Sequence, residues 1–127
     1  MVILMYQMLL SIKPEYVESI LSGHKKYEFR KIRCKQSVNK IIIYATSPIK
    51  QVVAEAEIDE IIQDDIMKVW EKTKKFSGIS YKFFKSYYKD REFAVAYKLR
   101  NVKRYDVPKT LSDYGISFVP QSFVYLK

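Results

Sequence analysis

Residues 22–30 read Ser-Gly-His-Lys-Lys-Tyr-Glu-Phe-Arg, in which a glycine is followed by alternating charged and aromatic side chains. Alternation over residues 26–30 is typical of a strand, and it predicts Lys26, Glu28 and Arg30 on one face. Tyr27 and Phe29 then occupy the opposite, apolar face. This segment is either a half-buried strand with a solvated row of charges or one wall of a functional site.

An amphipathic helix is predicted immediately upstream. Pro14 suits a first helical turn, and apolar residues recur at helical spacing as far as Leu21. Gly23 is a favourable left-handed residue for ending the helix. The apolar residues before Pro14 predict a first strand over residues 1–12.

Further strands and a helical insertion are predicted downstream. The uninterrupted apolar run 41–44 is typical of a buried central strand. After Asp64 the apolar spacing changes from that of a strand to that of a helix, which predicts a pair of helices between strands. The expected strands cover residues 40–46, 51–62, 92–99, 102–107 and 122–126, the expected helices cover 64–73 and 80–88, and a short helical segment surrounds Leu111.

The composition predicts one folded domain over residues 1–127. Hydrophobic residues make up 48% of the chain, and this content excludes a disordered class. Cys34 is the only cysteine and His24 the only histidine, so an internal disulfide is excluded and the usual cysteine-rich zinc sites are absent. We therefore expect no metal and no cofactor.

The charge balance favours a polyanionic partner. Lysine and arginine number 23 against 14 acidic residues, a formal charge of +9. RNA or DNA would suit this charge, although a lysine-rich composition also arises from an AT-rich genome. The opening segment has neither a basic region nor a small-residue cleavage site, and it is too short to cross a bilayer. We expect a cytoplasmic protein without membrane contact, and the sequence does not identify a protein partner.

The motifs and their order resemble the ASCH domain, a member of the PUA-like superfamily. The matching segments are residues 10–14, 20–23 and 25–30, together with the closing Pro-Gln-Ser-Phe at 120–123. The most specific part is the set Gly23, Lys25, Glu28 and Arg30. The closing segment resembles one branch of small prokaryotic ASCH proteins.

The resemblance implies an α+β fold with a PUA-like curved β-barrel of about six strands. It also implies an N-terminal helix, a helical insertion and a cleft beside the first helix. Relatives are proposed to bind RNA or to act on nucleotides at this cleft. The first hypothesis is therefore an RNA- or nucleotide-binding domain, with a regulatory role if it binds without turnover.

A ligand site in this cleft would combine cations with one carboxylate. Lys13, Lys25 and Arg30 would attract phosphate. Glu28 either holds these cations in place or accepts a hydrogen bond from an exocyclic amine of a base. The expected ligand-binding residues are Lys13, Lys25, Glu28, Arg30, Tyr44, Gln121 and Ser122.

Whether the site is catalytic stays open, with Lys25 and Glu28 as the catalytic residues if it is. Some ASCH proteins resemble ribonucleases, and Lys25, Tyr44 and Arg30 could serve that reaction without a metal ion. Another relative is an amidohydrolase that acts on acetylated cytidine with a lysine, a threonine and a glutamate. Lys25 matches that lysine, but Glu28 stands at the threonine position and no partner glutamate is found. A third hypothesis is a regulatory module for a protein or a small acidic ligand.

Overall fold

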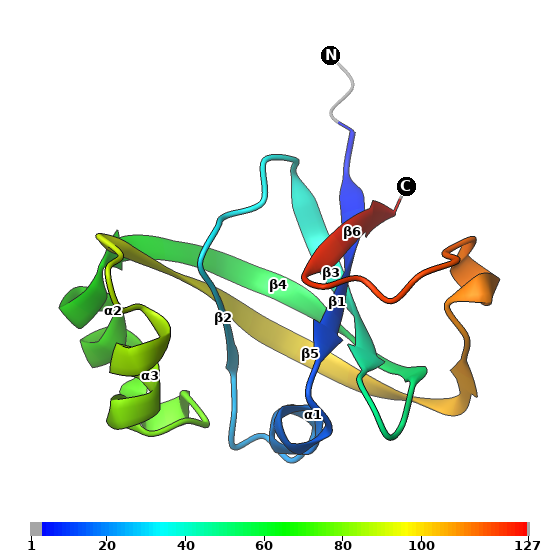
Figure 1. Cartoon of the computed structure of the whole chain (residues 1–127), viewed down its shortest axis with the longest axis horizontal. Coiled ribbons are helices and arrows are strands. Elements are labelled where there is room, and N and C mark those ends of the chain that lie inside the picture. The colour runs from blue at the N-terminus through cyan, green and yellow to red at the C-terminus, as the bar shows by residue number, and fades with distance from the viewer. Residues whose placement is uncertain (1–3, 127) are drawn as a thin grey trace.

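Six strands and three α-helices lie within residues 4–126, the part of the chain that the computed structural model describes (Figure 1). The predicted first strand begins only at Tyr6, and its residues 1–3 lie outside the described residues. The strands are β1 (Tyr6–Ile12), β2 (Tyr27–Arg30), β3 (Val38–Ala45), β4 (Gln51–Asp65), β5 (Phe93–Lys109) and β6 (Phe123–Leu126). The helices are α1 (Pro14–Leu21), α2 (Ile66–Thr73) and α3 (Tyr81–Tyr87), with short 3₁₀ turns η1 (Lys74–Phe76) and η2 (Ser112–Tyr114).

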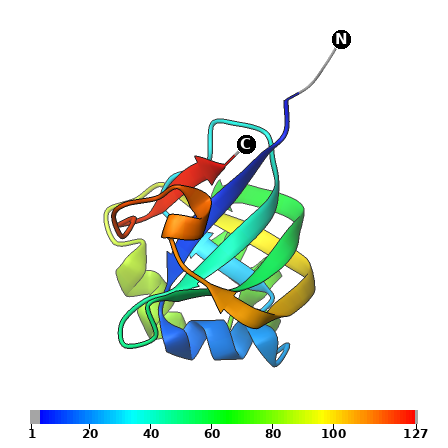
Figure 2. The same ribbon diagram turned by 90° about the vertical axis from the view of Figure 1, so that its right-hand side faces the viewer.

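All six strands belong to one mixed sheet with the order β2-β5-β4-β3-β1-β6. Only β1 and β3 pair in parallel, and the other neighbours are antiparallel. The sheet curls strongly, and α1 lies across its open end (Figure 2). β2 and β6 are its two edges within residues 4–126. The predicted α+β class and curved six-stranded sheet are therefore confirmed, but as an open sheet and not a closed barrel.

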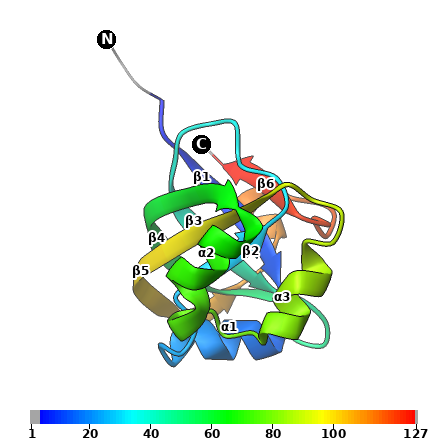
Figure 3. The same cartoon turned by 90° about the vertical axis from the view of Figure 1, so that its left-hand side faces the viewer.

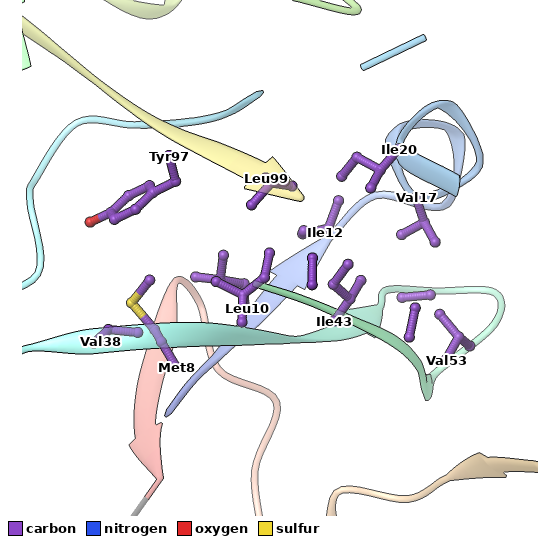
Figure 4. Close-up of a cluster of buried hydrophobic side chains, with 14 of the residues drawn as sticks. Met8, Leu10, Ile12, Val17, Ile20, Val38, Ile43, Val53, Tyr97 and Leu99 are labelled. Atoms are coloured by element: carbon purple, nitrogen blue, oxygen red, sulfur yellow. The ribbon is translucent and has the colours of Figure 1, made fainter. Parts of the chain in front are cut away.

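The main core lies between the curled sheet and α1. Val17 and Ile20 of α1 approach apolar side chains from β1, β3 and β5 (Figure 4). The helix ends as predicted, because Ser22 caps it and Gly23 adopts a left-handed φ of 85°. This packing fixes the direction in which the chain leaves α1 and enters β2.

The longest strands, β4 and β5, correct two predicted boundaries. A break was expected between Leu99 and Val102, yet β5 is continuous, because Asn101 takes a left-handed φ of 49° and the register with β4 shifts there. Asparagine tolerates that conformation better than most residues. β4 runs on to Asp65 because Asp64 and Asp65 still pair with β5, so the helix begins at Ile66.

The insertion α2–α3 packs against the sheet (Figure 3), and the contact is made by a second, aromatic cluster of side chains. Phe84 is fully buried, and the Trp70 ring lies 4.9 Å from it, measured between centroids. Ser80 caps α3 as predicted, accepting a hydrogen bond from the Phe83 N–H. The Tyr88 hydroxyl, 2.9 Å from the carbonyl oxygen of Arg30, connects the insertion to β2.

The helices in residues 4–126 are all too short and polar to span a bilayer.

Candidate functional site

A cavity of about 270 Å³ opens between α1, β2 and α3. Figure 3 shows these three elements on the same side of the molecule. Tyr16 of α1 and Phe83 of α3 meet across it, with ring centroids 6.2 Å apart. The residues that line the cavity are Ser11, Ile12, Lys13, Tyr16, Lys25, Glu28, Phe29, Arg30, Ile79, Phe83 and Tyr87.

Lys25 is buried in the wall of this cavity, with 3% of its surface exposed. Its Nζ donates a hydrogen bond to the carbonyl oxygen of Ser77 at 2.7 Å and lies 4.8 Å from the Phe29 ring centroid. Burial lowers the pKa of Lys25, although Glu28 acts in the opposite direction and Arg30 lowers it further. An ammonium group has three hydrogen-bond donors, and the Ser77 carbonyl oxygen accepts from one of them. A ligand in the cavity can therefore accept the remaining hydrogen bonds of this buried cation.

Gly78 brings the loop before α3 against this lysine. Its φ is 69°, and a Cβ placed there would lie 2.6 Å from the Lys25 Cβ. Glycine is required on both counts, since other residues disfavour this conformation and the side chain would overlap Lys25. The loop therefore fixes the position of Lys25 in addition to accepting its hydrogen bond.

Glu28 and Arg30 project into the cavity from β2, two residues apart. The Arg30 Nη2 donates to the Ser11 carbonyl oxygen at 3.0 Å and lies 3.7 Å from the Glu28 Oε2, beyond hydrogen-bond length. Glu28 Oε2 and Arg30 Nε are buried, and neither has a hydrogen-bond partner among the described residues. Unsatisfied buried polar atoms are costly to fold, so they indicate a place for a ligand's polar groups.

Aromatic rings form the other walls. Phe83 and Tyr87 lie one helical turn apart on α3, nearly parallel, with centroids 6.4 Å apart. Phe83 is 43% exposed, so its face is accessible. The prediction missed Tyr16, Phe83 and Tyr87 as site residues. The four-residue spacing of Phe83 and Tyr87 was the available signal, but it did not reveal that α3 folds back beside α1.

The cavity brings together four of the seven predicted ligand-binding residues, Lys13, Lys25, Glu28 and Arg30. Tyr44 is 3% exposed and lies away from the cavity. It belongs to a separate cluster with Leu9 and Ile42, on the face of β3 opposite the main core. It does not line the cavity.

Gln121 and Ser122 are exposed and also lie outside the cavity lining. Their segment supports the site indirectly. The Ser11 N–H donates to the Ser122 carbonyl oxygen at 3.2 Å, and the Ser11 hydroxyl donates to the Pro120 carbonyl oxygen at 2.6 Å. Because the Ser11 carbonyl oxygen accepts from Arg30, the closing segment helps to position that arginine.

No cluster of three His, Cys, Asp or Glu side chains suited to a metal ion occurs among residues 4–126. Cys34 is free and buried. His24 lies at the surface, and its Nδ1 is 2.8 Å from the Ser22 hydroxyl.

The ASCH domain family model matches residues 10–103. The chain belongs to the ASCH domain family. This ASCH chain is 33% identical over 93 residues to a protein of Zymomonas mobilis called ASCH domain-containing ribonuclease, covering 72% of this chain and 63% of that protein. It is 31% identical over 120 residues to large ribosomal subunit protein uL22 of Ureaplasma parvum, covering 94% of this chain. The chain spans only 39% of the length of that protein.

The crystal structure of ASCH from Zymomonas mobilis has the same fold. Its TM-score with this chain is 0.86 at 29% sequence identity, over 95% of this chain and 87% of that one. The agreement supports the PUA-like architecture of this ASCH chain.

Proposed function

We propose that the chain acts as a single ASCH domain that binds one nucleotide unit of RNA, or a free nucleotide-like ligand, in the cavity between α1, β2 and α3. The observation that carries this proposal is the largely buried set Lys25, Glu28 and Arg30, in which Glu28 Oε2 and Arg30 Nε lack partners among the described residues. Two cations with one free carboxylate oxygen suit a ligand that has both an anionic group and a hydrogen-bond donor.

A nucleotide has both groups. Arg30 and Lys25 would bind phosphate, with Lys13 at the exposed margin of the cavity. Glu28 would accept from the exocyclic amine of a base, and this gives the carboxylate a role that phosphate binding alone does not. Stacking of the base on a cavity aromatic such as Phe83 would contribute about 1–3 kcal/mol.

The size of the cavity supports a small ligand. A volume of about 270 Å³ is just below the usual range of ligand cavities, which begins at about 300 Å³, so it suits at most one nucleotide and not a base-paired segment. A cytoplasmic location would put the domain where RNA is present. DNA is a weaker candidate, because the named activity of the Zymomonas relative concerns RNA.

A second function, hydrolysis in the same cavity, is supported by a different observation. Burial lowers the pKa of Lys25, and a lysine of lowered pKa beside a carboxylate can act as a general acid or base. The reaction would be metal-independent cleavage of RNA or hydrolysis of a modified nucleoside such as acetylated cytidine. If RNA binds without being altered, the domain is a regulatory binding module.

The test compares site variants with a matched exposed pair. Binding of nucleoside monophosphates, short single-stranded RNA, matching DNA and acetylated cytidine is measured by calorimetry at near-physiological salt. Glu28→Gln and Arg30→Gln should each weaken RNA and nucleotide binding by about tenfold or more, as expected for a buried charged hydrogen bond. Glu57→Gln and Arg100→Gln change an exposed pair on β4 and β5 and should leave binding unchanged.

Equal affinity in all four variants would contradict the proposed site. Chromatography of the same mixtures separates the two functions. Product that forms without added metal and disappears in Lys25→Ala identifies an enzyme, whereas binding without product identifies a module. Thermal unfolding of each variant establishes that a loss of binding is not a loss of fold.

A further inference from the structure

The positive charge of the chain is concentrated on its helical insertion. Residues 66–89 contain seven lysines and a single acidic residue, Glu71, so they carry six of the nine net positive charges. Several cations of β3 and β5 differ from these lysines, because they have acidic partners. Lys98 pairs with Asp59, Arg100 with Glu57 and Asp59, Arg104 with Glu18, and Lys40 with Glu55. The insertion therefore carries most of the net positive charge, and among its seven lysines only Lys74 has an acidic partner among residues 4–126.

Three of these lysines form a row along α3 and the turn that follows it. Lys82 and Lys85 lie three residues apart on the helix, so they share one side of it, and Lys89 lies in the turn after Tyr87. Together with Ser86 they line an open groove. None of the three has a salt bridge among residues 4–126. We call Lys82, Lys85 and Lys89 the lysine row.

The lysine row borders the cavity. Phe83 and Tyr87, which line the cavity, directly follow Lys82 and Ser86 in the helix, so the aromatic side and the lysine side of α3 are adjacent. At the other margin, the Lys31 Nζ lies 5.0 Å from the Tyr87 ring centroid. A chain of phosphates that leaves the cavity over Phe83 would therefore meet cations at once.

We propose that the lysine row binds the phosphate backbone of single-stranded RNA while one nucleotide of that strand occupies the cavity. This inference rests on the proposed function of the cavity and extends it from one nucleotide to a strand. Charge complementarity selects a polyanion, and exposed aromatic faces beside a basic groove are the usual means of holding unpaired bases. If the lysine row served only to solvate the surface of α3, it would not need to lie beside the ligand cavity. Its position beside the cavity therefore favours RNA binding.

The experiment uses two variants with equal loss of charge. The row variant replaces the three lysines of the row with glutamine. The control variant replaces Lys68, Lys72 and Lys75 with glutamine, because these are exposed lysines of the same insertion that do not line the cavity. Each protein is titrated with a nucleoside monophosphate, with a single-stranded RNA of about eight nucleotides, and with DNA and polyglutamate of similar length.

The row variant should bind the oligonucleotide about tenfold or more weakly, and the slope of log affinity against log salt should fall by about 2 because three phosphate contacts are lost. Its affinity for the monophosphate should stay unchanged. The control variant should lose much less affinity for the oligonucleotide.

Equal losses in the two variants, or an unaffected row variant, would overturn the inference while leaving the cavity proposal intact. Polyglutamate binding as tight as RNA binding would overturn it in favour of an acidic protein partner. Binding of neither the monophosphate nor the oligonucleotide to the wild type would overturn the proposed function as well.

Discussion

Lys25 and Lys40 are both lysines near a glutamate, but their surroundings shift their pKa values in opposite directions. Lys40 donates to Glu55 at 2.7 Å on the sheet surface, and this hydrogen bond raises the pKa of Lys40 and lowers that of Glu55. Lys25 is buried and, among residues 4–126, its Nζ bonds only to the Ser77 carbonyl oxygen; burial lowers its pKa. The surface lysine and glutamate neutralise each other, whereas the cavity contains charged groups whose remaining hydrogen bonds a ligand can make.

The largest expected effect comes from removing Glu28, which is the only carboxylate among the described residues that line the cavity. Glu28→Ala leaves Lys25 and Arg30 close together without an anion, and we expect the free energy of unfolding to fall by about 3 kcal/mol. Urea denaturation measures it. The matched change Glu55→Ala should cost less than about 1 kcal/mol, because its lysine is partly exposed. Equal losses from the two variants would remove the distinction between the two regions.

Gly78→Ala tests how tightly the insertion holds the buried lysine. The new methyl group would overlap Lys25 in addition to requiring a left-handed backbone, so we expect a loss of about 2 kcal/mol and weaker ligand binding. Gly115→Ala is the control, since its φ is 72° but nothing lies within 4 Å of the new Cβ. The free energy of unfolding of that variant should fall by about 1 kcal/mol, and its affinity for the ligand should not change. If both variants behave alike in denaturation and binding, the overlap is unimportant.

The pH dependence of stability should have opposite signs at the two lysines. The pKa of Lys25 in the folded protein is below the ordinary 10.5, so the unfolded chain binds more protons between these two values and stability rises with pH there. The pKa of Lys40 is above 10.5 in the folded protein, so its contribution is present below 10.5 and is lost as pH rises through the higher value.

Lys25→Met and Lys40→Met should therefore change the stability curve in different pH ranges. For Lys25 the change should be about 1.4 kcal/mol for every pH unit that separates its pKa in the folded protein from its pKa in the unfolded chain, and for Lys40 it should be smaller because solvent screens the surface pair. Thermal unfolding between about pH 7 and 11 measures this effect as the difference from wild type, which cancels the tyrosines that also titrate. Parallel curves for all three proteins would contradict it.

The smallest expected effect is at an exposed ion pair. Arg104→Gln breaks the contact between Arg104 and Glu18. The Arg104 side chain is 56% exposed and the Glu18 side chain is 67% exposed. We expect a change below about 1 kcal/mol and no effect on ligand binding, because solvent screens the pair. A loss comparable with that of Glu28→Ala, measured by the same denaturation, would show that exposure does not separate the two regions.

The sequence predicted the elements whose ends carry local signals. Pro14 and Gly23 delimit α1, and Ser80 caps α3. The sequence did not reveal that β5 continues through Asn101, because the partner strand that sustains it is far away in the chain. Strand alternation predicted that Lys26 lies on the same face as Glu28. However, β2 begins at Tyr27, so the alternating segment does not include Lys25 or Lys26. The buried lysine of the site is Lys25.

The remaining differences in the site have a similar origin. The apolar residues 41–44 are buried on both faces of β3. Strand alternation therefore does not predict which face carries Tyr44. The contact between Tyr16 and Phe83 joins helices that are separated by three strands along the chain, and no local pattern encodes it. The charged part of the cavity was predictable because Lys25, Glu28 and Arg30 are neighbours in sequence.

Trp70 also makes this protein convenient to observe. It is the only tryptophan in the chain, and its ring lies 4.9 Å from Phe84 and 5.4 Å from Tyr81, between α2 and α3. Its fluorescence will therefore follow the packing of the two helices against each other and the sheet, without emission from any other tryptophan. Because α3 carries both the aromatic wall of the cavity and the lysine row, this intrinsic emission can report RNA binding in real time without an attached dye.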